Sequence, residues 1–290
     1  MHLSELCRNS DIDVITARLR QVASGSDTSA GNYVGDEAEP VDTRGLWSYQ
    51  DNDGRTAFHW AIALKNFDLA RTLMQEPYNS PVLTGDEEWN TPFATACSVG
   101  APLDLLREVL DRSVAAFAAQ MKHTEAHPSD TIAGTADGDA TPAPLHIPGL
   151  SRSTDGTPAS IAAAVIDAED ATGQTALLLA AGRGHTAIVR FLVEHGADLM
   201  RQNGRGQSAL HRAVNRGNVE LVEYLVSTSE AVHAANKAVH RRWMDLQDVR
   251  GDSALFYASM DNNEELGRYL LRHGADRDLR NTAGKTFWEV

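Results

Sequence analysis

The chain has 290 residues and a formal net charge of −14, and 42% of its residues are hydrophobic. This composition is typical of a soluble globular protein, and an acidic chain is repelled by phosphate backbones, which argues against a nucleic-acid partner. The two cysteines, Cys7 and Cys97, are too few for a disulfide framework and fit a reducing compartment. No run of 18 apolar residues predicts a membrane span, and the N-terminus lacks the apolar stretch of a signal peptide.

A short motif recurs along the chain at a fixed spacing. Gly-Gln-Thr-Ala-Leu at Gly173 returns as Gly-Gln-Ser-Ala-Leu at Gly206, 33 residues later. The related motif at Gly251 returns at Gly284 with the same spacing. Thirty-three residues is the period of the ankyrin repeat, which consists of a β-turn and two helices. We therefore expect an all-α fold, an ankyrin-repeat solenoid of about seven helix-turn-helix repeats with β-hairpin fingers.

Each copy predicts a turn followed by two helices. An Asp-x-x-Gly turn uses glycine for its positive φ, and the Thr or Ser after it, such as Thr56 or Thr91, caps a helix. Small residues follow, and a glycine such as Gly184 ends this inner helix. A second helix has apolar residues at helical spacing. The tetrapeptide His-Gly-Ala-Asp then turns the chain, at His195 and again at His273.

These units divide the chain into three segments. Residues 1–121 hold repeats one to three, of which the first, over about residues 1–40, is a degenerate capping repeat. Residues 122–166 are rich in proline and lack aromatic residues, which predicts a disordered low-complexity insertion. Residues 167–290 hold repeats four to seven, with the last one truncated as a cap. A hidden repeat starting at Thr141 is the alternative, but the Ile-Pro-Gly that soon follows cannot continue a helix.

No motif for catalysis or metal binding stands out from the repeats. The chain has 11 histidines but no His-Glu-x-x-His and no Cys-x-x-Cys. His59 and His211 share one repeat position, which favours a structural bond between hairpin and helix. The glycines around Arg183 and Arg205 look like phosphate loops, but repeat turns explain them. Asp51-Asn-Asp-Gly lacks the rest of a calcium loop. We expect no enzyme, no cofactor and no metal.

Several segments carry a more specific resemblance. Residues 50–61 read Gln-Asp-Asn-Asp-Gly-Arg-Thr-Ala-Phe-His-Trp-Ala, with Trp60 directly after the repeat histidine. Residues 89–93, 96–100, 210–218 and 246–248 continue the series in order. Together they resemble the gankyrin-like ankyrin-repeat chaperones of proteasome regulatory-particle assembly, in their fungal form. The resemblance covers all seven units outside the insertion.

The resemblance implies a function and a set of contact residues. In that family the concave face grips the C-terminal helical domain of one ring ATPase subunit, largely through complementary charge, and delays its docking on the core particle. Family basic positions are matched by Arg55 and Arg183, and an acidic one by Asp261. The remaining candidate partner contacts are Trp60, Trp89, Arg212 and Arg216. As an alternative, these charged residues are ordinary solvated side chains, such as any repeat surface carries. The alternative for Trp60 and Trp89 is that they pack between the hairpin and the inner helix.

The resemblance also implies a monomer in the cytoplasm and nucleus that acts by steric masking. Ala94, Leu178 and Phe256 depart from the repeat histidine. Residues 257–261 depart from the mammalian Leu-x-Cys-x-Glu segment, so its implied binding of the retinoblastoma protein is not expected here. Two rival functions remain: a generic ankyrin adaptor for a kinase or a ubiquitin-ligase substrate, and an enzyme with accessory repeats. The enzyme would need a catalytic domain, and no ordered segment is left for one.

Overall fold

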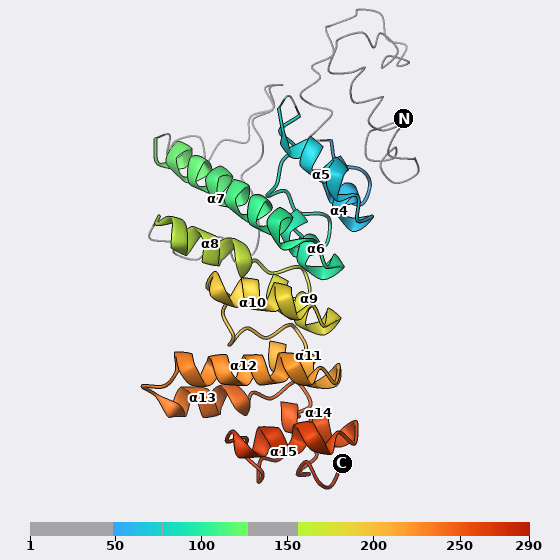
Figure 1. Ribbon diagram of the computed structural model, residues 1–290, viewed down its shortest axis with the longest axis vertical. Helices are drawn as coiled ribbons and strands as arrows, with labels where there is room; N and C mark the ends of the chain where they lie inside the picture. Colours follow the sequence, from blue (N-terminus) through green and yellow to red (C-terminus); the bar gives the residue numbers. More distant parts are fainter. Residues whose placement is uncertain (1–48, 77, 127–155) are drawn as a thin grey trace, which may run out of the picture. The chain divides into compact units, whose positions relative to one another are not determined.

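The computed structural model describes residues 49–76, 78–126 and 156–290, in two compact units divided between Ile147 and Pro148 (Figure 1). Every regular element in these ranges is a helix, and one isolated β-bridge joins Gln202 and Ser208. None of the described helices is long and apolar enough to cross a bilayer. The degenerate repeat expected over residues 1–40 lies outside the described residues.

The first unit contains two helix pairs, and the inner helix of each pair begins where the sequence predicts. The helices are α4 (Ala57–Ala63), α5 (Phe67–Met74), α6 (Pro92–Val99) and α7 (Leu103–Ala126). Thr56 accepts from the backbone N–H of His59 and Thr91 from that of Ala94, so each inner helix starts on a capping hydroxyl. Pro92 follows in the first turn, where its missing N–H has no cost. The inner helices α4 and α6 pack against each other, with α5 and α7 outside them.

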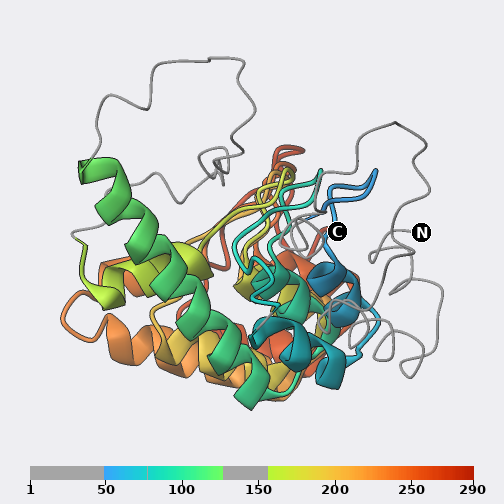
Figure 2. The same ribbon diagram turned by 90° about the horizontal axis from the view of Figure 1, so that it is seen from above.

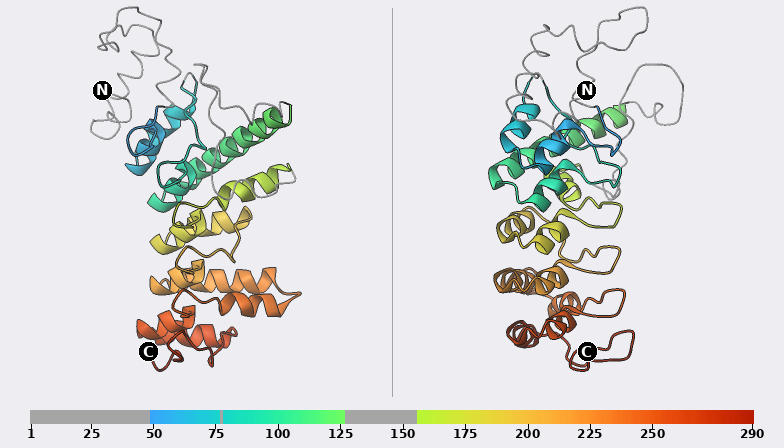
Figure 3. Two further views of the ribbon diagram at one scale, coloured as in Figure 1. Left: turned by 180° about the vertical axis from the view of Figure 1, so that it is seen from behind. Right: turned by 90° about the vertical axis from the view of Figure 1, so that its right-hand side faces the viewer.

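The second unit repeats this arrangement over residues 156–290. Its helices are α8 (Pro158–Ile166), α9 (Ala176–Arg183), α10 (Thr186–Glu194), α11 (Ala209–Asn215), α12 (Val219–Val232), α13 (Lys237–Met244), α14 (Ala254–Met260) and α15 (Glu264–Arg272). The inner helix α11 packs between α9 and α14, and α10, α12 and α15 form the outer row. Ala180, Ala181 and Ala213 are fully buried, so small side chains let the inner helices approach closely. The turns between repeats project to one side of this unit (Figures 2 and 3).

The projecting turns share one hydrogen-bond pattern. Asp170 opens one turn, and its Oδ1 accepts the backbone N–H groups of Thr172 and Gln174 at 2.8 and 2.9 Å. An Asp or Asn does the same in the other described turns, at positions 51, 86, 203, 248 and 281. Neighbouring turns are then tied together, because the N–H of Gly204 donates to the carbonyl of Thr172 at 2.8 Å. The turns therefore form a continuous ladder within the unit.

Helix α8 corrects the predicted extent of the insertion, which was placed at residues 122–166. Thr157 caps α8 through the N–H of Ser160, and Ile161, Val165 and Ile166 are buried at helical spacing. A proline in the first turn is compatible with a helix, so the proline-rich composition misled the prediction here. Helix α7 likewise continues past the predicted boundary, to Ala126. The stretch around the alternative start at Thr141 lies outside the described residues.

Ser208 and Ser253, the N-caps of successive inner helices, are 45 residues apart, which is 12 more than one period, and helix α13 lies in this interval. Asp245 follows α13 and accepts the N–H of Asp276 at 2.8 Å. Asp167 follows α8 and accepts the N–H of Asp198 at 3.1 Å. In both cases, the aspartate that follows the helix accepts a backbone N–H from an aspartate 31 residues further along the chain.

The repeat histidines have the structural role that the sequence predicts. The backbone N–H of Thr56 donates to Nδ1 of His59 at 3.1 Å, and Ser208 donates to His211 in the same way. Nε2 of His211 also pairs with the carbonyl of Asp252 at 3.1 Å, in the next turn. Both rings are almost completely buried.

The burial of His59 predicts a pH dependence of stability. Burial lowers the pKa of His59 to about 4, although the charge of Asp86 opposes the shift. The unfolded chain protonates this ring near its ordinary pKa of about 6.5, so the unfolded state gains stability as the pH falls. We expect His59 to cost about 2 kcal/mol of unfolding free energy between pH 7.5 and pH 5.

Urea denaturation of the wild type and of His59→Gln at both pH values measures this cost. The contributions of other groups cancel in the comparison, including Asp167, whose pKa burial raises to about 6 and which acts in the opposite direction. An equal loss in both proteins would contradict the prediction.

Candidate partner-binding surface

Four arginines gather on the face that the turns and inner helices of the second unit form. Arg183 ends α9, Arg212 lies on α11, Arg216 follows α11 as its C-cap, and Arg205 lies in the turn opened by Asn203. Arg183, Arg205 and Arg216 are exposed, whereas Arg212 is partly buried. We call these four residues the arginine cluster.

Contacts with glycines hold two members of the cluster beside the preceding repeat. A Cβ atom at Gly182 would overlap the guanidinium of Arg212, so this side chain lies directly over the glycine backbone. A Cβ atom at Gly184 would lie 3.8 Å from both Cγ and Nε of Arg216. Each of these arginines comes from one repeat and rests on a glycine of the repeat before it. The cluster therefore requires two neighbouring repeats.

Arg212 is in an electrostatically unfavourable position. Its pKa is lowered, first by burial and then by the positive charges of Arg183 and Arg205, while Tyr257 and Asp170 oppose the shift. Its Nε atom is buried and has no hydrogen-bond partner. A buried donor without a partner costs free energy, and a carboxylate from outside would relieve both the repulsion and the missing bond.

The cluster opens onto a small cavity. Arg205 and Arg212 line about 390 Å³ of space together with polar groups of two turns, namely Thr172, Gln174, Asn203 and Gly204. Within residues 49–76, 78–126 and 156–290, no carboxylate forms an ion pair with any arginine of the cluster. In a chain with a net charge of −14, such a group of arginines is conspicuous. The cavity is suited to an acidic side chain.

In the next turn along the same unit, the arginine is paired with carboxylates. Nε of Arg250 lies 3.3 Å from Oδ2 of Asp252 and 3.6 Å from Oδ2 of Asp248. The hydroxyl of Tyr257 donates to Asp248 at 2.9 Å and accepts from Nε2 of Gln207 at 2.8 Å. Unpaired positive charge is therefore concentrated one repeat earlier, around Arg212.

Asp261 lies on the same face with the opposite charge. It is the exposed C-cap of α14, the position that Arg216 holds after α11. Arg183, at the end of α9, has the corresponding place one repeat earlier. The ends of the inner helices thus present Arg, Arg and Asp in chain order. Charges of both signs on one face favour register and discrimination between partners.

The candidates of the first unit differ in accessibility. Nε of Arg55 lies 3.2 Å from Oδ2 of Asp86, and its guanidinium stacks 5.0 Å from the ring centre of Trp60. Trp60 is 8% exposed and donates from Nε1 to Oδ2 of Asp51 at 2.6 Å, so it is packed between turn and helix. This favours the packing alternative for Trp60 over a partner contact. Trp89, in contrast, is 43% exposed.

Arg205 is the member of the cluster that sequence reasoning missed. Its flanking glycines were attributed to the repeat turn, which is their role in the structure, and the arginine between them was given none. The signal that could have identified it is its place in the turn directly before Ser208 and α11, since α11 contains Arg212 and is followed by Arg216.

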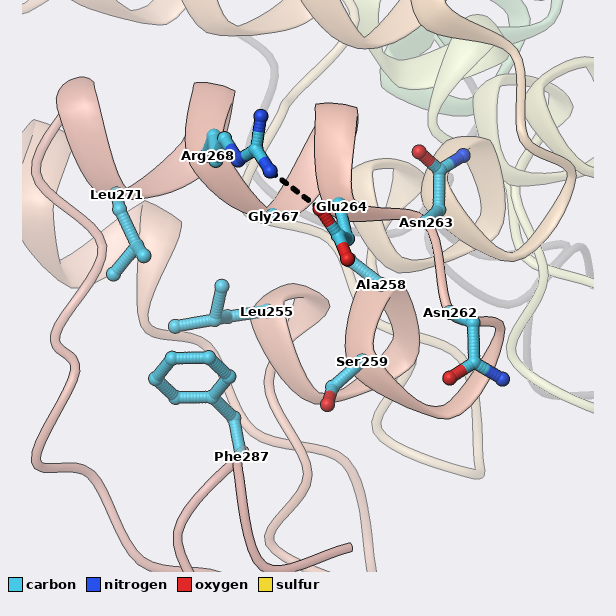
Figure 4. Close-up of a pocket in the computed structure, with 10 residues that line it drawn as sticks. All are labelled: Leu255, Ala258, Ser259, Asn262, Asn263, Glu264, Gly267, Arg268, Leu271 and Phe287. Atoms are coloured by element: carbon cyan, nitrogen blue, oxygen red, sulfur yellow. Dashed lines mark hydrogen bonds and ion pairs between the residues drawn. The ribbon is translucent and has the colours of Figure 1, made fainter.

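A second cavity, of about 250 Å³, lies beside α14 and α15 (Figure 4). Leu255, Leu271 and Phe287 form its apolar side. Its charged residues, Arg268 and Glu264, pair with each other. It therefore lacks the unpaired charge that marks the arginine cluster. No group of three or more potential metal ligands occurs within the described residues.

Comparison with known families identifies the repeats of the second unit. A family model for three copies of the ankyrin repeat matches residues 156–238, and a model for a single ankyrin repeat matches residues 250–282. The second unit is an array of ankyrin repeats. The first match includes α8, which again places residues 156–166 within the repeats and outside an insertion.

A solved structure extends the comparison to the whole chain. The ankyrin repeat domain of Bcl-3, described as a unique member of the IkappaB protein family, is 20% identical, with a TM-score of 0.56. The match covers 99% of this chain and 92% of that one. At this identity the likeness concerns the fold alone, and it confirms the predicted all-helical ankyrin-repeat fold. No curated protein sequence matches the chain.

Proposed function

We propose that this protein is a non-enzymatic chaperone that masks the C-terminal helical domain of a proteasomal ATPase subunit during assembly of the regulatory particle. Ankyrin repeats are protein-interaction scaffolds and typically have no catalytic role, and they account for residues 156–238 and 250–282. The observation that carries the proposal is the arginine cluster, in which Nε of Arg212 is buried without a partner.

The chemistry of the cluster indicates the kind of surface it binds. A guanidinium presents a planar set of donors that matches a carboxylate with two parallel hydrogen bonds. Nucleic acid would also offer anions, but a chain with a net charge of −14 is repelled by a phosphate backbone. An acidic segment of a protein fits both the local positive charge and the overall negative charge.

The sequence resemblance supplies the identity of the partner in this proposal. Residues 50–61 and 89–100 resemble gankyrin-like chaperones in the first unit, and residues 210–218 and 246–248 do so in the second. In that family the bound domain belongs to a ring ATPase, and charge complementarity dominates the contact. A monomer in the cytoplasm and nucleus, acting without a cofactor, completes the proposal.

The proposal predicts that Arg183→Glu/Arg212→Glu binds the purified ATPase C-terminal domain at least about 100-fold more weakly than the wild type, since losing a buried charge partner costs about 2–5 kcal/mol. Isothermal titration calorimetry measures the loss. The matched control is Arg268→Glu/Arg272→Glu, which makes the same change of charge on the outer helix α15. This control should stay within about threefold of the wild type, because exposed charges outside an interface contribute little.

The alternative function is that of a generic ankyrin adaptor for another protein. It would be favoured if no ATPase domain binds the wild type, while a different protein is captured from lysate and lost in Arg183→Glu/Arg212→Glu. Equal binding by this variant and the α15 control would contradict a role of the arginine cluster under either function.

A further inference from the structure

One turn of the first unit has an unusual residue at its fourth position. The other described turns have glycine there, at positive φ: Gly54 (71°), Gly173 (75°), Gly206 (75°), Gly251 (76°) and Gly284 (73°). Trp89 holds this position with φ 63°. Its N–H donates to the carbonyl of Asp86 at 2.8 Å, as the N–H of Gly54 donates to Asp51 at 2.9 Å. The turn therefore has the same geometry as the others, although a tryptophan stands where they have glycine.

This substitution carries a conformational cost. The left-handed region brings the Cβ of an L-residue too close to a carbonyl oxygen, and a bulky residue there is an outlier. The backbone of Trp89 passes close to Gly85, where a Cβ atom would lie 3.2 Å from the Cα of Trp89. The glycine therefore leaves room for this turn. Strained backbone positions persist where surrounding structure enforces them, and they concentrate at functional sites.

The side chain of Trp89 is exposed to solvent in spite of this conformational cost. Trp89 is 43% exposed, whereas Trp60 and Trp243 are 8% and 1% exposed. Burial in the core therefore does not explain the tryptophan at this position. Tryptophan is one of the residue types enriched among interface residues that dominate binding energy, which makes an exposed one on a rigid turn a suitable anchor.

The residues next to Trp89 in the turn are negatively charged. Glu87 and Glu88 precede it in the turn, and both are exposed. Across the described ranges, neither glutamate has an ion-pair partner. Asp86, in contrast, is buried against Arg55. The tip is thus an aromatic ring with two available carboxylates, opposite in charge to the arginine cluster of the second unit.

We propose that residues 87–89 form an anchoring tip, which inserts Trp89 into an apolar pocket of a protein partner whose rim carries Arg or Lys side chains. The glutamates of the tip pair with that rim. This inference shares with the proposed function only the existence of a protein partner, and it places a second contact of opposite charge on the first unit.

Trp89→Gly tests the tip because stability and binding should change in opposite directions. Glycine removes the strain, so the melting temperature should rise by about 2–4 °C. Loss of the indole should weaken binding of the partner at least about tenfold. The control Trp288→Gly removes another exposed indole (50% exposed) and should leave binding within about twofold. Glu87→Lys/Glu88→Lys should weaken binding most at low salt, where charge contacts are least screened.

Binding is measured by quantitative pull-down from lysate with the full chain, wild type against variants, and then as a Kd for each protein that is depleted. A protein lost with Trp89→Gly and retained with Trp288→Gly supports the tip, whatever its identity. The identity of that protein then tests the proposed function separately, since a partner other than a proteasomal ATPase supports the tip and contradicts the chaperone.

Two results would overturn the anchoring tip. The first is a lower melting temperature of Trp89→Gly, which would mean that the indole stabilises the fold. The second is that no captured protein depends on Trp89, including the case in which the ATPase subunit binds Trp89→Gly and the wild type equally well.

Discussion

Gly206→Ala is expected to lower the free energy of unfolding by about 3 kcal/mol. Gly206 has a φ of +75°, which alone costs an alanine about 1–2 kcal/mol. A Cβ there would also come within 2.8 Å of Cα and 3.0 Å of the carbonyl carbon of Asp248, which are backbone atoms that cannot rotate away. Relief of this overlap would displace the next turn and strain the 3.0 Å bond from the N–H of Val249 to the carbonyl of Arg205.

Gly217→Ala is the matched control in the same repeat. Gly217 also has a positive φ, of +67°, but a Cβ there would meet nothing within 4 Å. It should therefore show only the conformational cost, about 1–2 kcal/mol. Urea denaturation of the three proteins, followed by circular dichroism, separates the two effects. Equal losses in the two variants would mean that the neighbouring turn does not approach Gly206 as closely as described.

Trp243→Ala is expected to have the largest effect of any substitution in α13, about 4 kcal/mol. The ring is 1% exposed, and its Nε1 donates to the carbonyl of Leu199 at 2.9 Å, which ties α13 to the preceding repeat. The alanine variant loses the packing and also leaves this buried carbonyl without its partner. His240 holds the same helix through Ser229 at 3.1 Å and the carbonyl of His273 at 3.2 Å.

Two further variants make the test of Trp243 specific. Trp243→Phe keeps most of the apolar contact and loses the hydrogen bond, so its cost should be intermediate. Trp288→Ala removes a half-exposed tryptophan and should cost less than about 1 kcal/mol. Calorimetric melting of all three variants measures the order. A Trp243→Ala protein as stable as Trp288→Ala would show that α13 is not anchored to the repeats.

The helix starts could be predicted from the sequence because each depends on a few neighbouring residues. Thr56, Thr91 and Thr175 each precede a helix that begins at the next residue, and Ser208 and Ser253 do the same. A capping hydroxyl acts over three residues, so one period of the motif contains the whole signal.

The extra helices were harder to predict because their signal is not periodic. Helix α8 follows a proline-rich stretch whose composition outweighed the apolar spacing of its buried residues. Helix α13 lies where the repeat is longer than 33 residues, and extra length alone does not specify a helix. Both are held by tertiary contacts, such as the bond from Trp243 to Leu199, which joins residues 44 positions apart.

The positions of the candidate residues could be predicted in part for the same reason. Arg183 and Arg216 are 33 residues apart, so the repeat period alone gives them the same place in successive repeats, which is where they lie in the structure. The pairing of Arg55 with Asp86, in contrast, depends on how one turn packs against another, and no local pattern reveals it. The seat of Arg212 over Gly182 likewise joins two different repeats.

The contact between Arg212 and Gly182 affects how a bound partner dissociates. The guanidinium of Arg212 comes from one repeat and rests on the backbone of the repeat before it, so the surface exists only while both are folded and docked. Repeat arrays can open locally without unfolding completely, because each repeat contacts only its neighbours. Separation of these two repeats would divide the arginine cluster, and the proposed acidic segment of a partner would then be released. A bound partner would in turn hold the two repeats together, so its residence time is coupled to local opening of the array.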